Sequence, residues 1–240
     1  MMTYSQVENK TKEIRKRIIR MNAHAGQGHT GADLSETDIL ASLFLRVLRY
    51  DKEKLDDPDR DRFILSKGHG VGGFYCTLVE AGLLNEALLE TYLQFDSKLP
   101  GHPVRQKTPG VELNTGALGH GLSVGVGLAL SAKMSGRNFR VFVLTGDGEL
   151  QGGSILQAAM SAAHFKLDNL IVIVDRNTLQ LADRTEKIMA LEPLADKWRA
   201  FGFDVQQTSG NDVTQFVDTV EGLDLHNRKP HVVLARTIKG

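Results

Sequence analysis

The residues best suited to chemistry lie in the segment TGDGELQGGS, residues 145–154. Asp147 stands there between two glycines, directly after the apolar run FRVFVL and before ILQAAMSAAHF. A second polar group, DRN at residues 175–177, closes the apolar run LIVIVD. Asp147 and Asn177 are 30 residues apart, which is the length of one strand–helix–strand unit. Adjacent parallel strands would therefore bring both side chains to one crevice.

The side-chain oxygens of Asp147 and Asn177 are hard donors that suit Mg²⁺ or Ca²⁺. Mg²⁺ usually takes only one or two protein carboxylates and adds phosphate oxygens. The backbone amides of Gly148 and Glu149, at the entry to a predicted helix, suit an anion. Either motif alone is better explained as a turn cap. The two together at this spacing predict a metal–diphosphate site.

Four histidines follow a glycine in a glycine-rich turn: His29, His69, His102 and His120. Glycine lets backbone come close to a ligand, so we expect these imidazoles to face a cleft. Their spacing lacks the short repeat of a zinc site. For the other four histidines, the simpler interpretation is that polar turns collect them: His24, His164, His226 and His231.

Two other patterns compete with the metal–diphosphate interpretation. The glycines of KGHGVGG (67–73) match a dinucleotide-binding fingerprint, but the helix-like NEALLETYLQF follows where a second strand is needed. GLSVG (121–125) matches a nucleophile elbow, but no apolar strand precedes Ser123. We expect these last glycines to serve helix packing.

The order of elements predicts an α/β fold with a mostly parallel sheet flanked by helices on both faces. Ser35 is expected to open one helix, with Asp38 in a capping-box position. Other helices are expected at 5–22, 69–81, 86–95, 117–135, 153–166, 192–201 and 212–222. Strands are expected at 62–65, 139–145, 170–175, 203–207 and 231–236. Residues 96–115, with three prolines and several glycines, predict a long loop.

Composition excludes several classes of protein. The formal net charge of the 240 residues is zero, which gives no electrostatic case for binding nucleic acid or an anionic membrane. The basic stretch from Lys10 to Arg20 is expected to be a solvated helix face, and Trp198 a core residue. Cys76 is the only cysteine. Together with a charged amino terminus, this predicts a reducing compartment and a cytoplasmic protein.

The chain resembles the amino-terminal, thiamine-diphosphate-binding part of transketolase over nearly its whole length. The matching stretches are GQGHTGADLSETDIL, DRDRFILSKGHG, LPGHPVRQKTPGVELNTGALGHGLSVGVGLAL, TGDGELQGGS, KLDNLIVIVDRNTLQ and VVLARTIKG. This resemblance implies a single thiamine-diphosphate-binding domain over residues 1–240. It also implies a transferase that moves a two-carbon ketol unit from a ketose, expected to be phosphorylated, to an aldose.

The resemblance implies a role for each matching position. Asp147, Asn177 and the carbonyl of Leu179 would hold Mg²⁺ (or Ca²⁺). The contacts to thiamine diphosphate would come from His69, Gly116, Leu118, Gly148 and Glu149. The histidines of the substrate channel would be His29, His69 and His102. Imidazole suits the transfer of sugar hydroxyl protons because its ordinary pKa is near neutral.

The resemblance also implies a partner. The pyrimidine-binding domain is absent from these residues, so we expect it on a second chain, in an α2β2 assembly. The sequence closes at Gly240, before a family segment that holds another active-site histidine. Gly152 stands where the family has a glutamate that couples the two active sites, and His120 replaces a glutamine. Two alternatives stay open: a related enzyme for a branched or sulfonated sugar, and a non-catalytic binding or regulatory module.

Overall fold

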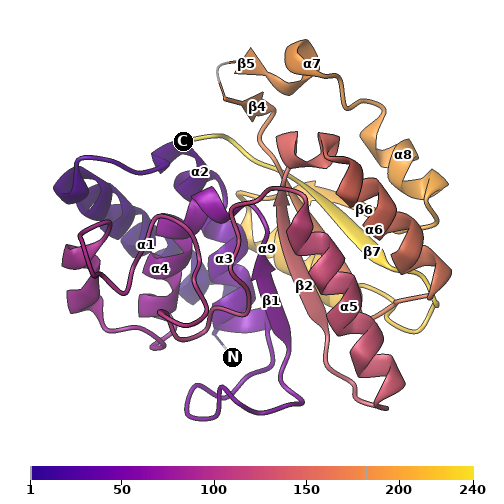
Figure 1. The fold of residues 1–240 in the computed structure, drawn as a ribbon, viewed down its shortest axis with the longest axis horizontal. Helices are drawn as coiled ribbons and strands as arrows, with labels where there is room; N and C mark the ends of the chain where they lie inside the picture. The colour runs from indigo at the N-terminus through magenta and orange to yellow at the C-terminus, as the bar shows by residue number, and fades with distance from the viewer. Residues whose placement is uncertain (1, 182) are drawn as a thin grey trace.

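The computed structural model describes residues 2–181 and 183–240 and is built around a five-stranded sheet (Figure 1). Across the sheet the strands are β1 (Arg62–Leu65), β2 (Val141–Gly146), β3 (Leu170–Arg176), β7 (His231–Arg236) and β6 (Asp204–Ser209). Every neighbouring pair is parallel. The predicted parallel sheet is confirmed, and β2 and β3 lie side by side, as the spacing of their polar ends required.

Helices cover both faces of the sheet. The α-helices are α1 (Tyr4–Ala25), α2 (Thr30–Ser35), α3 (Thr37–Ser42), α4 (Val71–Glu80), α5 (His120–Met134), α6 (Gly153–His164), α7 (Thr185–Ile188), α8 (Leu194–Ala200) and α9 (Val213–Glu221). Shorter turns are the π-helical η1 (Leu43–Val47) and the 3₁₀ helices η2 (Gly68–Gly70), η3 (Glu86–Thr91) and η4 (Gly148–Gln151). A small antiparallel hairpin joins β4 (Leu179–Gln180) to β5 (Asp183–Arg184).

Alternation along the strands creates two apolar cores. Successive side chains of a strand point to opposite faces, so Phe142 and Leu144 pack with α1, α3, α4 and α9. Val141 and Val143 point the other way and pack with α5, α6 and α8. Trp198 lies in this second core, as predicted. Among the described residues, no helix combines the length and apolar character needed to cross a membrane.

The amino-terminal helix shows how local signals set its ends. Thr3 and Gln6 form a capping box at the start of α1, and Gly26 ends it at φ +66°. Two of its basic residues are partly buried in ion pairs, whereas the sequence predicted a solvated helix face. Arg15 binds Asp38 across the packed interface, and Arg17 binds Glu80.

Two helix predictions are wrong in detail. Ser35 ends α2 rather than opening a helix, and its hydroxyl donates to the Ala32 carbonyl (3.1 Å) and to Asp175 Oδ2 (2.6 Å). Asp38 has no capping role because its carboxylate is bound by Arg15. Residues 86–95 form only the 3₁₀ helix Glu86–Thr91.

Other elements agree with expectation apart from small shifts of their ends, and residues 96–115 contain no helix or strand. The interpretation of His231 as a polar-turn residue is wrong, because it begins β7 and is buried.

The glycines of GLSVG serve close packing, as expected. A Cβ at Gly125 would lie 2.5 Å from Val143 Cγ2 on β2, and one at Gly121 would lie 2.4 Å from Ser66 Oγ. Ser123 is exposed on α5. Because Ser123 lies inside α5 and not at a turn between a strand and a helix, the nucleophile-elbow interpretation is excluded.

Gly125 and Gly127 of α5 have different surroundings, so they provide a matched test of the packing role. Gly125→Ala should destabilise the protein by about 1–3 kcal/mol because the new methyl group overpacks against Val143. Gly127→Ala is the control, since nothing lies within 4 Å of its Cβ position, and it should be neutral or stabilise by up to about 1 kcal/mol. Urea unfolding measures both, and equal effects would contradict the packing role.

Candidate active site

A cavity of about 670 Å³ lies at the carboxyl ends of β1, β2 and β3. Ligands of open α/β sheets bind at this edge. The lining residues are Gly28, His29, Thr30, Gly31, Ala32, Lys67, His69, His102, Gly116, Leu118, Gly146, Asp147, Gly148, Glu149, Asn177, Leu179, Gln180, Leu181 and Lys239. Every predicted metal-binding, cofactor-binding and catalytic residue is in this set. Predicted site residues that are up to 150 positions apart in the sequence therefore line the same cavity.

Three of the four Gly-His pairs meet in the cavity. The rings of His29 and His69 have centroids 5.5 Å apart, and those of His29 and His102 are 6.4 Å apart. His120 differs, because it begins α5 in an exposed position and is not among the lining residues. The expectation that it faces the cleft is wrong.

Burial keeps two of these three histidines uncharged. Together with the nearby charge of Lys67 and with His29, it lowers the pKa of His69 to about 3. Burial also lowers the pKa of His102. Neutral imidazole both accepts and donates a hydrogen bond.

Asp147 follows β2 and has its two oxygens in different environments. Oδ2 accepts hydrogen bonds from Arg176 Nη1 (3.0 Å) and the Thr178 amide (2.6 Å). Among the described residues, Oδ1 accepts only from the adjacent Gly148 amide (2.8 Å). Burial raises the pKa of the carboxyl despite Arg176. A cation on the cavity side would offset this cost of burying the charge.

The neighbouring donors have the chemistry that a hard cation needs. Asn177 Oδ1 accepts the Leu179 amide at 3.1 Å, and the Leu179 carbonyl accepts Lys239 Nζ at 3.4 Å. Among the described residues, no cluster of three histidine, cysteine or acidic side chains could hold a metal. The set of one carboxylate, one amide oxygen and one carbonyl instead fits Mg²⁺ or Ca²⁺ that is also bound by phosphate.

Two glycines of the cavity allow its segments to pack closely. Gly116 has φ +135°, and a Cβ there would lie 2.7 Å from His102 Cδ2. A Cβ at Gly148 would lie 2.8 Å from Gln180 Cδ. A larger residue at either position would displace His102 or Gln180, which both line the cavity.

The side chain of Glu149 accepts hydrogen bonds that the sequence did not predict. Its carboxylate accepts the amides of Gly119 (2.7 Å) and Gly146 (3.1 Å), and the hydroxyl of Ser66. Burial raises its pKa. Glu149 thus ties together three segments of the cavity wall, whereas its predicted role concerned only the backbone amide.

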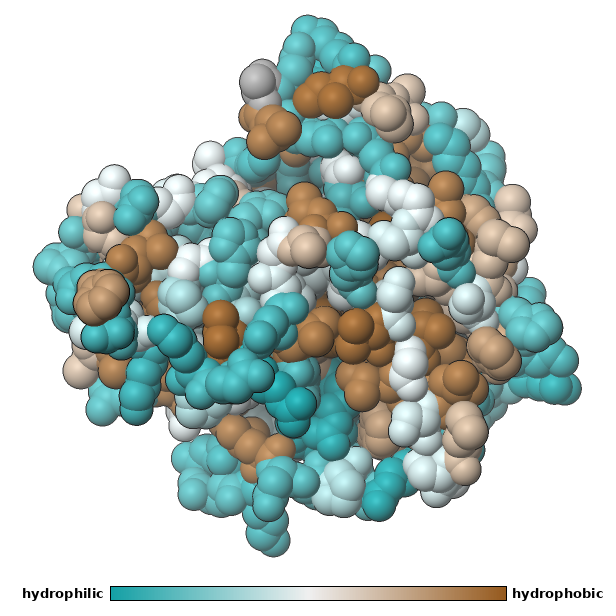
Figure 2. All heavy atoms as spheres, in the orientation of Figure 1, coloured by the Kyte–Doolittle hydropathy of each residue, from teal (hydrophilic) through white to brown (hydrophobic). Residues whose placement is uncertain are grey.

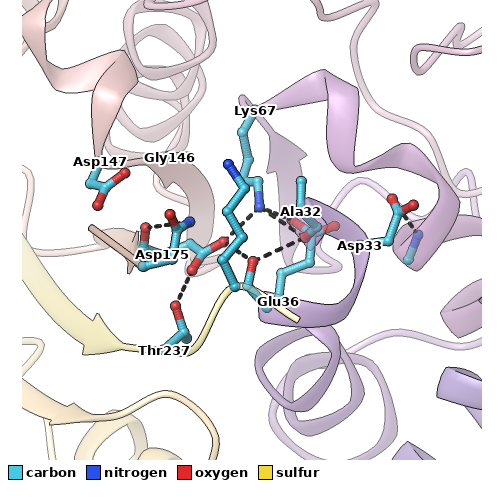
Figure 3. Close-up of polar contacts among 12 residues, drawn as sticks. Ala32, Asp33, Glu36, Lys67, Gly146, Asp147, Asp175 and Thr237 are labelled. Atoms are coloured by element: carbon cyan, nitrogen blue, oxygen red, sulfur yellow. Dashed lines mark hydrogen bonds and ion pairs between the residues drawn. The ribbon is translucent and has the colours of Figure 1, made fainter. Parts of the chain in front are cut away.

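A buried ion cluster lies beneath the cavity (Figure 3). The Lys67 ammonium, only 1% exposed, lies 2.6 Å from Asp175 Oδ2, 2.9 Å from Glu36 Oε2 and 3.1 Å from the Ala32 carbonyl. Asp175 also accepts hydrogen bonds from the hydroxyls of Ser35 and Thr237. The cluster therefore joins the ends of β1 and β3, helix α2 and the segment after β7.

The two acids of this cluster are not equivalent. Burial alone would raise the pKa of Asp175, but Lys67 and the two hydroxyls hold it below its usual value. Burial raises the pKa of Glu36 well above its usual value, and Lys67 only partly offsets this. The two acids in turn raise the pKa of Lys67 against the effect of burial. Lys67 and Asp175 form the charged pair, and Glu36 favours its proton.

Several cavity residues were not singled out from the sequence, chiefly Lys67, Gln180, Leu181 and Lys239. Lysines are usually solvated, so a single lysine gives little signal. Both lysines lie in motifs that carry the family resemblance, SKGH and TIKG. An alignment of those motifs to a known site is the signal that could have identified them.

Gly152 lies at the start of α6 with φ −70° and ψ 131°. The nearest atoms to a Cβ there would be the Glu149 carbonyl oxygen at 3.3 Å, the Cα of Gly119 at 3.9 Å and Ser154 Oγ at 3.9 Å. This backbone conformation accepts any residue. The conformation therefore does not require glycine where the family has glutamate.

The sheet, the two apolar cores and the cavity at the strand ends define an α/β ligand-binding domain. The chain belongs to the transketolase family, because residues 8–240 match the family described as "Transketolase, thiamine diphosphate binding domain". It is the amino-terminal, thiamine-diphosphate-binding part of a transketolase.

Similar proteins cover the whole chain. An apulose-4-phosphate transketolase subunit of Actinobacillus succinogenes is 56% identical over 240 residues, which is 100% of this chain and 87% of that protein. A 6-deoxy-6-sulfo-D-fructose transketolase subunit of Clostridium sp. (strain MSTE9) is 38% identical over 98% of this chain and 85% of that protein. The solved transketolase of Leishmania mexicana has a TM-score of 0.90 at 32% identity, over 99% of this chain and 37% of that one.

The ion cluster predicts unequal effects of two substitutions. Lys67→Met should cost about 3–5 kcal/mol of unfolding free energy at pH 7, because it leaves buried Asp175 without its cation. Glu36→Gln should cost much less, because the Lys67–Asp175 pair is retained. Chemical denaturation measures both, and equal losses would contradict the assignment of the charged pair.

The same cluster has a pH signature. The folded state holds the Glu36 proton more tightly than the unfolded state. The wild type therefore loses stability as pH rises above 4.5, the ordinary pKa of the group. Relative to wild type, Glu36→Gln should therefore gain stability as the pH rises above 4.5. A difference that does not change with pH in denaturation experiments would rule out a protonated Glu36.

Proposed function

We propose that this chain is the diphosphate-binding subunit of a two-subunit transketolase, in which the pyrimidine-binding domain lies on a separate chain. The enzyme would transfer a two-carbon ketol unit from a phosphorylated ketose to an aldose. The observation that carries the proposal is the convergence of Asp147, Asn177, Gly148 and three histidines on one cavity. Thiamine diphosphate supplies the carbanion chemistry when bound.

The residues of this chain would bind the diphosphate end of the cofactor and orient the sugar. Asp147, Asn177 and the Leu179 carbonyl would hold Mg²⁺ (or Ca²⁺) against the diphosphate. The Glu149 amide and the Lys239 ammonium would add donors to the same anion. The backbone of Gly148, whose amide is bound to Asp147 Oδ1, would lie against it. Gly116 and Leu118 would lie against the aminopyrimidine.

The histidines would act on the substrate. His29, His69 and His102 stand close together, and a neutral ring can accept a proton from one hydroxyl while donating to another oxygen. Burial of His69 keeps it from being charged near neutral pH. We propose that these rings move or hold sugar hydroxyl protons at their ring nitrogens.

An apolar rim supports the need for a partner. Leu181 is 96% exposed and Leu118 is 48% exposed, and both line the cavity. Hydrophobic side chains also gather over α5 (Figure 2), and Leu156 and Met160 are exposed on the adjacent α6. Exposed apolar surface beside a site is typical of an interface. We propose that the partner covers this face, in an α2β2 assembly located in the cytoplasm.

The donor sugar is proposed from the relatives. The relative with 56% identity is named for apulose 4-phosphate and that with 38% identity for a sulfonated fructose. Apulose 4-phosphate is therefore the first donor to test, and 6-deoxy-6-sulfo-D-fructose the second. A donor and acceptor screen of the reconstituted enzyme separates them, and no turnover with any ketose would favour the non-catalytic module.

Activity should require both subunits. The purified chain should show no ketol transfer alone and gain it with its partner, thiamine diphosphate and Mg²⁺. Asp147→Ala should weaken metal-dependent binding of thiamine diphosphate by more than about 100-fold, because it removes the carboxylate that holds the metal. Asp196→Ala, an exposed acid on α8, is the control. Calorimetry and a coupled assay measure these effects, and robust activity of the chain alone would refute the split-enzyme proposal.

The proposed partner face can be tested separately. Met160, 62% exposed on α6, should tolerate Met160→Asp in the isolated chain but weaken association with the partner by at least about tenfold, because a charge would be desolvated. Ile19→Asp on α1, across the sheet from α6 (Figure 1), is the control. Analytical ultracentrifugation measures association, and equal binding by both variants would exclude this face.

A further inference from the structure

Arg176, the last residue of β3, donates hydrogen bonds to four side chains. Its Nη1 donates to Asp147 Oδ2 (3.0 Å) and Thr185 Oγ1 (2.8 Å). Its Nη2 donates to Glu186 Oε1 (2.9 Å) and Glu192 Oε1 (3.0 Å). The side chain is only 10% exposed. One guanidinium therefore joins the carboxylate that follows β2 to a segment more than thirty residues further along the chain.

That segment, residues 178–193 apart from 182, forms part of the cavity. It contains the β4–β5 hairpin and α7, which extend beyond the carboxyl edge of the sheet (Figure 1). Leu179, Gln180 and Leu181 from this hairpin line the cavity. Arg176 contacts the part of the segment that follows the hairpin, through Thr185 and Glu186 of α7 and through Glu192.

The base of the hairpin contacts the same carboxylate oxygen. The Thr178 amide donates to Asp147 Oδ2 at 2.6 Å, and Thr178 has φ +67°. The Thr178 carbonyl accepts the Thr185 amide at 3.0 Å, which closes the loop beside Arg176. Oδ2 is thus occupied by two donors, while within the described part of the chain Oδ1 carries only the adjacent Gly148 amide.

We propose that Arg176 is a positioning residue for the metal–diphosphate site. It fixes the orientation of Asp147 so that Oδ1 is the oxygen offered to the cavity, and it holds the hairpin that carries the Leu179 carbonyl. This inference rests on the proposed function, because it assigns Arg176 a role in a site that Asp147 and Leu179 would form. Arg176 does not line the cavity, so it acts through these residues.

Positioning and charge make opposite predictions here. As a positive charge beside Asp147, Arg176 would repel a metal ion, so its removal would strengthen metal binding. As a planar fork it bridges Asp147 to the hairpin, so its loss would weaken metal binding. Lysine keeps the charge but lacks the planar fork, so it cannot donate to Asp147 and Thr185 from one nitrogen and to Glu186 and Glu192 from another. The variants Arg176→Lys and Arg176→Met therefore separate the two effects.

The experiment titrates the full chain with Mg²⁺ by calorimetry in saturating thiamine diphosphate. If Arg176 positions the site, both variants should raise the apparent Kd for Mg²⁺ about tenfold or more, and excess Mg²⁺ should restore cofactor binding. If charge dominates, Arg176→Met should bind Mg²⁺ more tightly and Arg176→Lys should match the wild type, which would overturn the proposal. Unchanged binding in both variants would overturn it as well.

The controls keep the test independent of folding and of the proposed function. Arg236→Met changes the residue paired in register with Arg176 on β7 and should leave the Mg²⁺ constant unchanged. Glu192→Gln weakens only one contact of the Arg176 guanidinium, so it should raise the Kd for Mg²⁺ less than Arg176→Lys does. This variant still tests the proposal if the arginine variants fold poorly. Binding that is abolished by Asp147→Ala but ignores all these variants would overturn only the role of Arg176. Wild-type binding that ignores Asp147→Ala would overturn the site itself.

Discussion

The cavity depends on the buried pair formed by Lys67 and Asp175. An unpaired charge in a core is costly, so the ammonium after β1 and the carboxylate at the end of β3 must stay together. Because β2 lies between these strands, the pair spans the strand end that carries Asp147. Ser35 and Thr237 bind the same carboxylate, which fixes α2 and the segment holding Lys239. One ion pair thus places the loops from four parts of the chain around the cavity.

Local patterns predicted that Asp147 and Asn177 would meet at one edge of the sheet, and both line one cavity, but the same patterns gave no sign of the ion cluster around Lys67. Asp147 and Asn177 each follow an apolar run, and alternating strands and helices require such strand ends to meet at one edge. Lys67 carries no comparable local signal, because its partners Glu36 and Asp175 are 31 and 108 residues away. Ser35 illustrates the same limit. The residues around Ser35 predict a helix cap, but its hydroxyl donates to the buried carboxylate of Asp175. Only the tertiary fold brings these two residues together.

The polar groups around Asp147 and Asn177 form two sets: those bound to other protein atoms and those that face the cavity. Arg176 and the Thr178 amide bind one oxygen of Asp147, and the carboxylate of Glu149 accepts the amides of Gly119 and Gly146. Beside Asp147, the cavity is lined by Asn177, Leu179 and Lys239. Such a small set of protein ligands suits the proposed metal–diphosphate site, because phosphate oxygens would complete the coordination shell.

The polar floor and the apolar rim of the cavity place different demands on the protein. The floor is formed within this chain, since its charges are paired and His69 and His102 are kept neutral by burial. The rim differs, because Leu118 and Leu181 meet solvent where an active site should exclude water. Covering them would bury apolar area and also lower the dielectric around the histidines and the oxygens of Asp147 and Asn177, which strengthens every electrostatic contact there. If a partner covers this rim, as proposed, its association would therefore also change the electrostatics of the cavity.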